Sequence, residues 1–141
     1  MDQNSMIIQE ELAQALANLS PAALQRHASR LLHTYCEAKF IRHGAIEKLI
    51  AHLDSFPECG GLTDWERKGA TLPLNGRGDN MPPDLLHCIS SQDIDDFRVI
   101  VDCAVEVGLV DMYSTPTEHP IKFIEMICLI LSRNNIALPR L

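Results

Sequence analysis

Three residues of one predicted helix have side chains that suit zinc binding. His33, Cys36 and Glu37 lie three and four positions apart, so a helix would place them on one face. A structural zinc site takes about four ligands, and no second pair with a zinc-binding spacing accompanies them. The alternative interpretation is that the six histidines are surface and boundary residues. The sequence therefore predicts no metal centre and no cofactor, and a metal-binding protein or an enzyme of unknown class is kept as a third hypothesis.

The sequence lacks the motifs that mark common catalytic sites. It has no G-x-S-x-G, no H-E-x-x-H, no phosphate-binding P-loop and no G-x-G-x-x-G. His87 and Cys88 are a base and a thiol, but adjacent residues on a helix point about 100° apart. No two carboxylates stand out as an acid and base pair. We therefore expect no catalytic residues and predict that the chain is not an enzyme.

The net charge disfavours one large class of partner. The 141 residues carry 19 acidic and 12 basic side chains, a net charge of −7. Proteins that bind nucleic acid without sequence preference need a basic surface, so this balance argues against them. The only basic cluster, in residues 21–43, consists of Arg26, Arg30, Lys39 and Arg42. A helical-bundle regulator that contacts DNA through this segment is the second hypothesis.

The negative charge is concentrated in residues 84–111, which contain seven acidic residues and one basic residue, Arg98. On a helix, Asp95, Asp102 and Glu106 fall with Arg98 within about 80° of one another. A solvated stripe of this kind would steer and hold a basic partner protein. The alternative is that the acids near residue 95 favour the helix dipole and that Asp102 and Glu106 are simply solvated.

Residues 57–83 are rich in proline and glycine and predict a long irregular loop. Within it, Thr63 and Glu66 have the spacing of a capping box, which predicts one or two helical turns. Trp65, the only tryptophan, is surrounded by charge, and tryptophan and arginine are favoured as interface anchors. The predicted partner-binding residues of this loop are Trp65, Arg67, Lys68 and Arg77. The alternative is that Trp65 packs on the bundle while the three bases face a partner.

The rest of the chain is predicted to be mainly helical. Apolar residues at helical spacing predict helices over residues 5–19, 21–42, 45–56, 84–89, 92–107 and 117–132. Gly44 and Gly108 are the expected C-caps of the second helix and of 92–107. Short links suggest that the first three helices are antiparallel neighbours. The predicted fold is all-α, a single domain over residues 1–141 with five to six helices. The runner-up is a small α+β protein with short strands at 70–75 or 109–114.

The pattern of residues 92–107 is compatible with two kinds of secondary structure. Apolar residues alternate from Phe97 to Val107, as they would in a strand. However, a strand would place Asp95 and Arg98 on opposite faces, whereas a helix gathers the charged residues into one stripe. The segment is therefore predicted to be a mostly buried helix with a narrow exposed stripe.

The predicted setting is a soluble, cytoplasmic protein. The start has no positively charged segment typical of a signal peptide, and the longest apolar run, residues 126–131, is too short for a membrane span. The five cysteines are an odd number without a C-x-x-C pair, which favours reduced thiols. The leading hypothesis is a small acidic module that binds another protein, as an inhibitor, immunity factor, adaptor or chaperone does. A homodimer is compatible with it.

Overall fold

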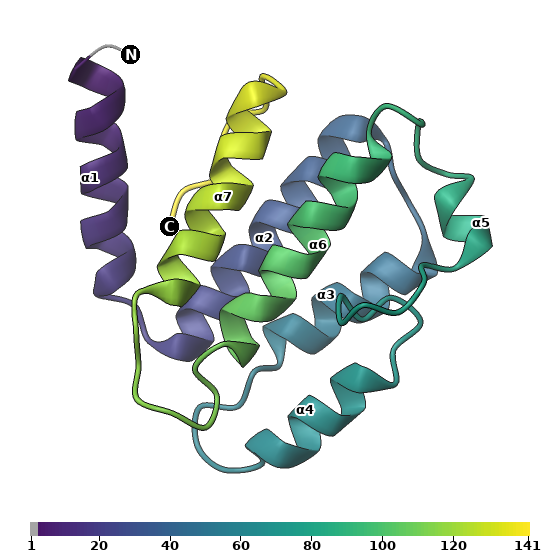
Figure 1. Ribbon diagram of the computed structural model, residues 1–141, viewed down its shortest axis with the longest axis horizontal. Helices are drawn as coiled ribbons and strands as arrows, with labels where there is room; N and C mark the ends of the chain where they lie inside the picture. Colours follow the sequence, from purple (N-terminus) through teal and green to yellow (C-terminus); the bar gives the residue numbers. More distant parts are fainter. Residues whose placement is uncertain (1–2) are drawn as a thin grey trace.

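The computed structural model describes the backbone of residues 3–141 and the side chains of residues 10–141, and in this part of the chain seven helices and no strand are present (Figure 1). The helices are α1 (Gln3–Ala17), α2 (Pro21–Lys39), α3 (Gly44–Asp54), α4 (Leu62–Ala70), α5 (Pro83–Leu86), α6 (Ile94–Leu109) and α7 (His119–Arg133). The all-α prediction is confirmed. The predicted number of helices was too low because residues 57–83 contain α4, a helix of nine residues. No described helix has both the length and the apolar character that a membrane span requires.

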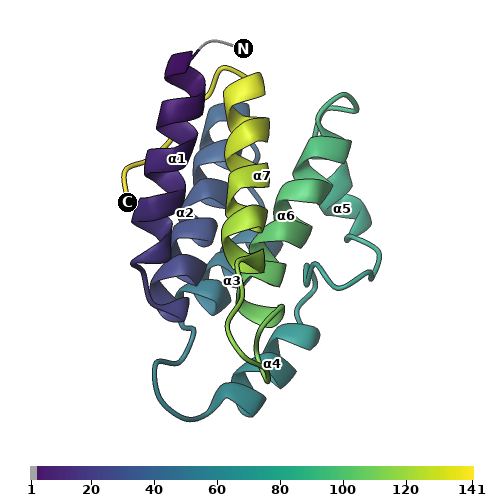
Figure 2. The same cartoon turned by 60° about the vertical axis from the view of Figure 1, so that its left-hand side comes forward.

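Three helices, α2, α6 and α7, lie side by side and form the centre of the bundle (Figures 1 and 2). Helix α6 runs antiparallel to both α2 and α7, and it packs on each of them. Helix α3 packs across α2, and α4 packs on α3. The short link between α1 and α2 predicted close neighbours, but α1 has its more extensive contacts with α7. Helix α7 therefore contacts three helices, α1, α2 and α6.

The predicted arrangement of residues 92–107 as a helix with one exposed stripe is confirmed. Phe97, Ile100 and Ala104 are fully buried against the neighbouring helices, as their helical spacing predicts. Asp95 and Asp102 lie on the opposite face and are exposed. Two sides of the segment are buried because both α2 and α7 pack on it. This double burial explains the alternating apolar residues that resemble the pattern of a strand.

Two helix ends differ from the prediction. Helix α2 ends at Lys39, and its C-cap is Phe40, which adopts the left-handed conformation with φ of 58°. The N–H of Ile41 donates to Cys36 O at 2.9 Å, as in a Schellman motif, and the apolar Ile41 side chain is buried behind it. Gly44 is not the cap but the first residue of α3.

Gly108 was predicted to close the helix of residues 92–107, but it lies inside α6, which continues to Leu109. A Cβ at this position would overlap Oε1 of Gln25 on α2 and lie 3.1 Å from Cε2 of Phe56. The glycine is therefore required by the close packing of Gln25 and Phe56 on α6 and not by the helix end.

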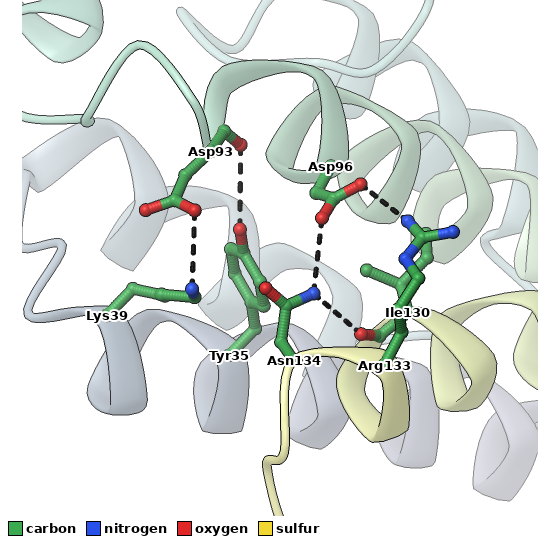
Figure 3. A network of polar contacts seen from close by, with 7 residues as sticks. All are labelled: Tyr35, Lys39, Asp93, Asp96, Ile130, Arg133 and Asn134. Carbon is green, nitrogen blue, oxygen red and sulfur yellow. Dashed lines mark hydrogen bonds and ion pairs between the residues drawn. The ribbon is translucent and has the colours of Figure 1, made fainter.

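A set of charged and amide side chains, the polar clamp, joins one end of the three central helices (Figure 3). Lys39 Nζ at the end of α2 lies 3.2 Å from Asp93 Oδ1 at the start of α6. Arg133 Nη2 at the end of α7 donates to Asp96 Oδ1 at 2.8 Å, and Asn134 Nδ2 donates to Asp96 Oδ2 at 3.1 Å. Charge-assisted bonds of this kind are short and directional, so they fix the relative positions of the three helix ends.

Candidate functional site

Most of the acidic residues in the segment 84–111 are used inside the fold. Four of the seven have partners among the described residues: Asp84 with His43 at 2.9 Å, Asp93 with Lys39 at 3.2 Å, Asp96 with Arg133 at 2.8 Å, and Asp111 with Thr117 at 2.7 Å. Asp93 and Asp96 join helix ends, Asp84 joins α5 to His43, and Asp111 fixes the α6–α7 loop. Asp93 and Asp96 are mostly covered by their partners, whereas the side chain of Asp84 stays 76% exposed.

The remaining three, Asp95, Asp102 and Glu106, form what is called here the acidic stripe. None of them forms an ion pair or a side-chain hydrogen bond with the described residues. Asp95 and Asp102 are exposed and Glu106 is half-buried. The stripe covers about 16 Å of helix, since each residue adds about 1.5 Å of rise. Val99, 40% exposed, lies between Asp95 and Asp102 and adds an apolar contact point.

Asp102 has a distinct environment within the acidic stripe. It lines a small pocket of about 80 Å³ together with Arg98 and with Gly76 and Asp79 of the loop that packs beside α6. Partial burial raises the pKa of Asp102, and the positive charge of Arg98 acts in the opposite direction. The loop thus covers one edge of the stripe and leaves its other edge, towards Val99, open.

Trp65, the predicted anchor of the loop, is only 7% exposed. Its indole stacks on the imidazole of His52, and its edge meets the ring of Phe56 at a centroid distance of 4.8 Å. The indole N–H donates to His52 O at 2.8 Å. Helix α4 starts at Leu62 after Gly61, which has no side chain to cap it, so the predicted capping box at Thr63 is not the start. Trp65 therefore holds α4 on α3 and leaves little surface for a partner.

Arg77 is also committed to the fold. Its Nη1 donates to Glu66 Oε1 at 3.1 Å, and only 18% of its side chain is exposed. The side chains of Arg77 and His52 converge over Gly69, where a Cβ would lie within 2.6 Å of both. Burial lowers the pKa of His52, and the charges of Arg77 and Lys68 lower it further. The positive charges of Arg77 and Lys68 beside His52 therefore disfavour protonation of its imidazole.

Arg67 and Lys68 lie on the outer face of α4 and are exposed. The guanidinium of Arg67 lies 3.9 Å from Asp64, and both side chains are about three-quarters exposed, so this ion pair is weak. No ion pair or hydrogen bond of the described residues links Arg67 or Lys68 to the acidic stripe. Of the predicted loop residues, these two have the most surface to offer a partner.

The four cations of the basic cluster in residues 21–43 differ in their surroundings. Arg26 Nη1 lies 3.6 Å from Glu58, Arg30 Nη1 donates to Arg140 O at 2.9 Å, and Lys39 belongs to the polar clamp. Arg42 is exposed and has no ion pair with a described side chain. Arg26 and Arg30 remain exposed cations, since the Arg26–Glu58 pair is solvent-accessible and the acceptor of Arg30 is a neutral carbonyl.

The residues that suggested a zinc site are separated by burial. Cys36 is buried, and burial raises the pKa of its thiol to about 12, whereas His33 and Glu37 are exposed and lie 3.9 Å apart. The side chains described in the structure, from residue 10 onward, bring together no group of three or more histidine, cysteine, aspartate or glutamate residues that is suited to a metal ion.

The structure also contains a pocket of about 750 Å³ that the sequence did not indicate. It lies at the end of the bundle opposite the polar clamp, where α1 ends, α2 begins, α6 ends and α7 begins (Figure 1). Its apolar wall includes Leu16, Leu24, Phe56 and Ile121, which come from four separate segments. The only sequence signal was Gly108, a glycine within a buried apolar helix, which marks a close approach of other side chains.

Comparisons of the chain with protein-family models, with curated proteins and with solved structures found no match.

Proposed function

We propose that this protein binds another protein that has a basic surface, and that the acidic stripe of α6 is the principal contact. The proposal rests on a difference in pairing among the seven acidic residues of the segment 84–111. Four of the seven are paired within the fold, whereas Asp95, Asp102 and Glu106 are aligned on one helix face without internal partners. Like charges four residues apart on a helix, such as Asp102 and Glu106, repel one another, and a basic partner would relieve that repulsion.

The proposed mode of action is masking or docking of the partner. The three carboxylates of the stripe lie along about 16 Å of helix, a length that matches a basic helix or an extended basic segment on the partner. Charge attraction would raise the rate of association, and the apolar Val99 would supply a contact that excludes water. Arg67 and Lys68 on α4 are proposed as secondary contacts, since both are exposed.

The experiment compares affinity capture by three tagged proteins from cells that naturally make this chain. The first is the wild type, and the second carries Asp95→Lys, Asp102→Lys and Glu106→Lys. The third is a matched control with Glu11→Lys, Asp54→Lys and Glu125→Lys, which changes the net charge equally at exposed positions outside the stripe. Mass spectrometry quantifies each captured protein, and circular dichroism verifies that all three proteins are helical.

The expected result is a basic protein that is recovered with the wild type and the control but lost with the stripe variant. Its recovery should also fall with added salt, because salt screens attraction between exposed charges. If the same proteins are recovered with the stripe variant and the control in equal amounts, the acidic stripe is not the contact. Recovery of nucleic acid in place of a protein would favour the DNA-binding hypothesis.

A further inference from the structure

The 750 Å³ pocket has the size of a small-molecule site, since pockets that bind small ligands commonly measure about 300–1,000 Å³. Its walls come from the α1–α2 turn, the α3–α4 connection and the α6–α7 loop, which gather at one end of the bundle in both views (Figures 1 and 2). The lining is mainly apolar, and the pocket is partly open to solvent. A ligand can therefore bury an apolar body there and keep a charged group in contact with water.

The charged residues of the pocket lining are both acidic. They are Glu58 and Asp111, and no lysine, arginine or histidine of the described part of the chain lines the pocket. Glu58 lies 3.6 Å from Arg26, and both side chains are well exposed, so this ion pair is weak and a second cation can compete for the carboxylate. The lining therefore attracts a cationic group and repels an anionic one.

Asp111 contributes a carboxylate in a fixed orientation. The backbone N–H of Thr117 donates to its Oδ2 at 2.7 Å, and the Thr117 hydroxyl donates to its Oδ1 at 2.9 Å. A carboxylate has about four acceptor sites, so these two hydrogens leave room for a further donor. Asp111 is half-buried and forms no ion pair with the side chains that the structure describes. The pocket therefore contains an oriented carboxylate without a counter-ion.

The helix starts at this end of the bundle offer an anion little compensation. Free N–H groups at a helix N-terminus attract anions, and both α2 and α7 begin at the pocket. However, Ser20 Oγ already accepts a backbone N–H of α2, and Thr117 Oγ1 accepts one of α7. Pro21 and Pro120, which line the pocket, have no N–H. Few donors are therefore left for a carboxylate or phosphate group.

We propose that this pocket binds a small organic cation, a molecule with an apolar body and one ammonium group that pairs with the carboxylate of Asp111. The apolar walls recognise the body of the ligand, and the oriented carboxylate selects a positive charge over a neutral or negative group. The net charge of −7 of the chain adds a general attraction for cations. This inference is independent of the acidic stripe, whose three residues do not line the pocket.

The protein contains its own reporter for this site. Trp65 is the only tryptophan, and its ring centroid lies 4.8 Å from that of Phe56, a pocket residue. A ligand in contact with Phe56 is therefore close enough to accept excitation energy from Trp65. The dansyl group absorbs where tryptophan emits, and its fused aromatic rings supply an apolar body, so dansylamides are the probes for the experiment.

The experiment titrates the purified full chain with three dansylamides and records dansyl emission on excitation of Trp65. The compounds differ only in a short side arm, which is aminoethyl in the cation, hydroxyethyl in the neutral compound and carboxymethyl in the anion. The expected result is saturable energy transfer with the aminoethyl compound. Its affinity should exceed that of the hydroxyethyl compound at least about five-fold, as one partly exposed ion pair provides, and the carboxymethyl compound should bind weakest.

The variant Asp111→Asn tests the carboxylate. Asparagine keeps an oxygen that accepts from Thr117 but loses the negative charge, so the aminoethyl and hydroxyethyl compounds should bind this variant about equally. Glu125→Gln is the matched control, because it removes one negative charge at an exposed position of α7 outside the pocket. This control should keep the preference for the aminoethyl compound.

Two further variants locate the binding. Ala17 lines the pocket from an exposed helix position, so Ala17→Phe should occupy part of the pocket and weaken binding of the aminoethyl compound at least about five-fold. Ala38 is an exposed alanine near the end of α2 outside the pocket, and Ala38→Phe should leave binding unchanged. Both changes are at exposed positions, and circular dichroism verifies that every variant is folded before the titration.

Three results would overturn the proposal. They are no saturable energy transfer from the wild type to the aminoethyl compound, equal affinity of the wild type for the aminoethyl and hydroxyethyl compounds, and equal affinity of the Ala17→Phe and Ala38→Phe proteins for the aminoethyl compound. A preference for the cation that persists undiminished in Asp111→Asn would overturn the role of Asp111.

Discussion

The indole of Trp65 lies flat on the imidazole of His52, with ring centroids 4.3 Å apart and planes inclined by 10°. This stack attaches α4 to α3, and the indole hydrogen bond to the backbone of His52 reinforces it. The same imidazole faces Arg77, so one side chain both holds the tryptophan and lies beside a cation. Protonation of His52 would therefore act on the position of the whole loop.

Stability is expected to fall as the pH is lowered from 7.5 to 5.5. Burial lowers the pKa of both His27 and His52, and the charges of Arg30 and of Arg77 and Lys68, respectively, add to the effect. Unfolded histidines bind a proton near pH 6.5, whereas these two resist it in the folded state. The unfolded state therefore gains protons first, and the free energy of unfolding decreases below about pH 6.5. Urea unfolding at several pH values, followed by Trp65 fluorescence, measures it.

The variants His52→Phe and His27→Gln identify the source of this dependence. Phenylalanine keeps an aromatic ring against Trp65 but cannot be protonated, so His52→Phe should flatten the decrease between pH 7.5 and 5.5. His27→Gln should do the same for the second site. An unchanged decrease in both variants would show that neither histidine is responsible.

Replacement of Phe40 by glycine is expected to stabilise the protein. The left-handed conformation costs a residue with a Cβ roughly 1–2 kcal/mol, while the added freedom of glycine in the unfolded chain costs about 0.4–1 kcal/mol. The Phe40 ring is 84% exposed, so little packing is lost. Phe40→Gly should thus raise the free energy of unfolding by about 0.5–1 kcal/mol. Ala51→Gly, at an exposed position within α3, should lower it by a similar amount. A loss of stability in Phe40→Gly would contradict this account.

Gly108→Ala is expected to destabilise the protein although alanine favours helices. The new Cβ would overlap Gln25 Oε1 and crowd Phe56, and overpacking of this kind costs about 1–3 kcal/mol. The double variant Gln25→Ala/Gly108→Ala should lose less than the sum of the two single variants, since each change makes room for the other. Gly44→Ala is the control because a Cβ there meets nothing within 4 Å. Additive losses would mean that the two residues are not coupled.

Two of the five thiols are expected to react with a disulfide reagent in the native protein. Cys59 and Cys88 are exposed, whereas Cys36, Cys103 and Cys128 are buried. Burial raises the pKa of the buried thiols, to about 12 for Cys36 and about 11 for Cys128. Because the thiolate is the reactive form, these thiols should react only after unfolding. Rapid modification of a third thiol under native conditions would refute the assignment.

Periodicity predicted the features that depend on one helix. The acidic stripe and the buried face of α6 follow from residue spacing alone, because a helix fixes which side chains share a face. The ends of the helices were less predictable. Phe40 closes α2 where a glycine was expected, since the buried Ile41 that follows it supplies the apolar contact of the cap. Helix α4 was underestimated because its support comes from the stack of Trp65 on α3 and not from a local cap.

Features formed by contact between distant segments could not be predicted from the sequence. The charges of the 84–111 window were correctly located, but which acids are paired depends on residues far along the chain. Asp84 meets His43 and Asp96 meets Arg133, 41 and 37 positions away. The pocket has the same origin, since its walls come together only when four helix ends meet. A single sequence gives the composition of each segment but does not show which distant segments are in contact.

The polar clamp gives the bundle two chemically different ends. Ion pairs and amide bonds hold α2, α6 and α7 together near Lys39 and Asp96, while apolar side chains surround the pocket at the opposite end of the same helices. Salt screens the more exposed Arg133–Asp96 pair more strongly than the mostly covered Lys39–Asp93 pair, whereas apolar solutes act where water is displaced from hydrocarbon surface. Ionic strength should therefore act on the end that holds the polar clamp, and apolar solutes should act on the end that holds the pocket. Each end of the same three helices responds to its own solvent condition.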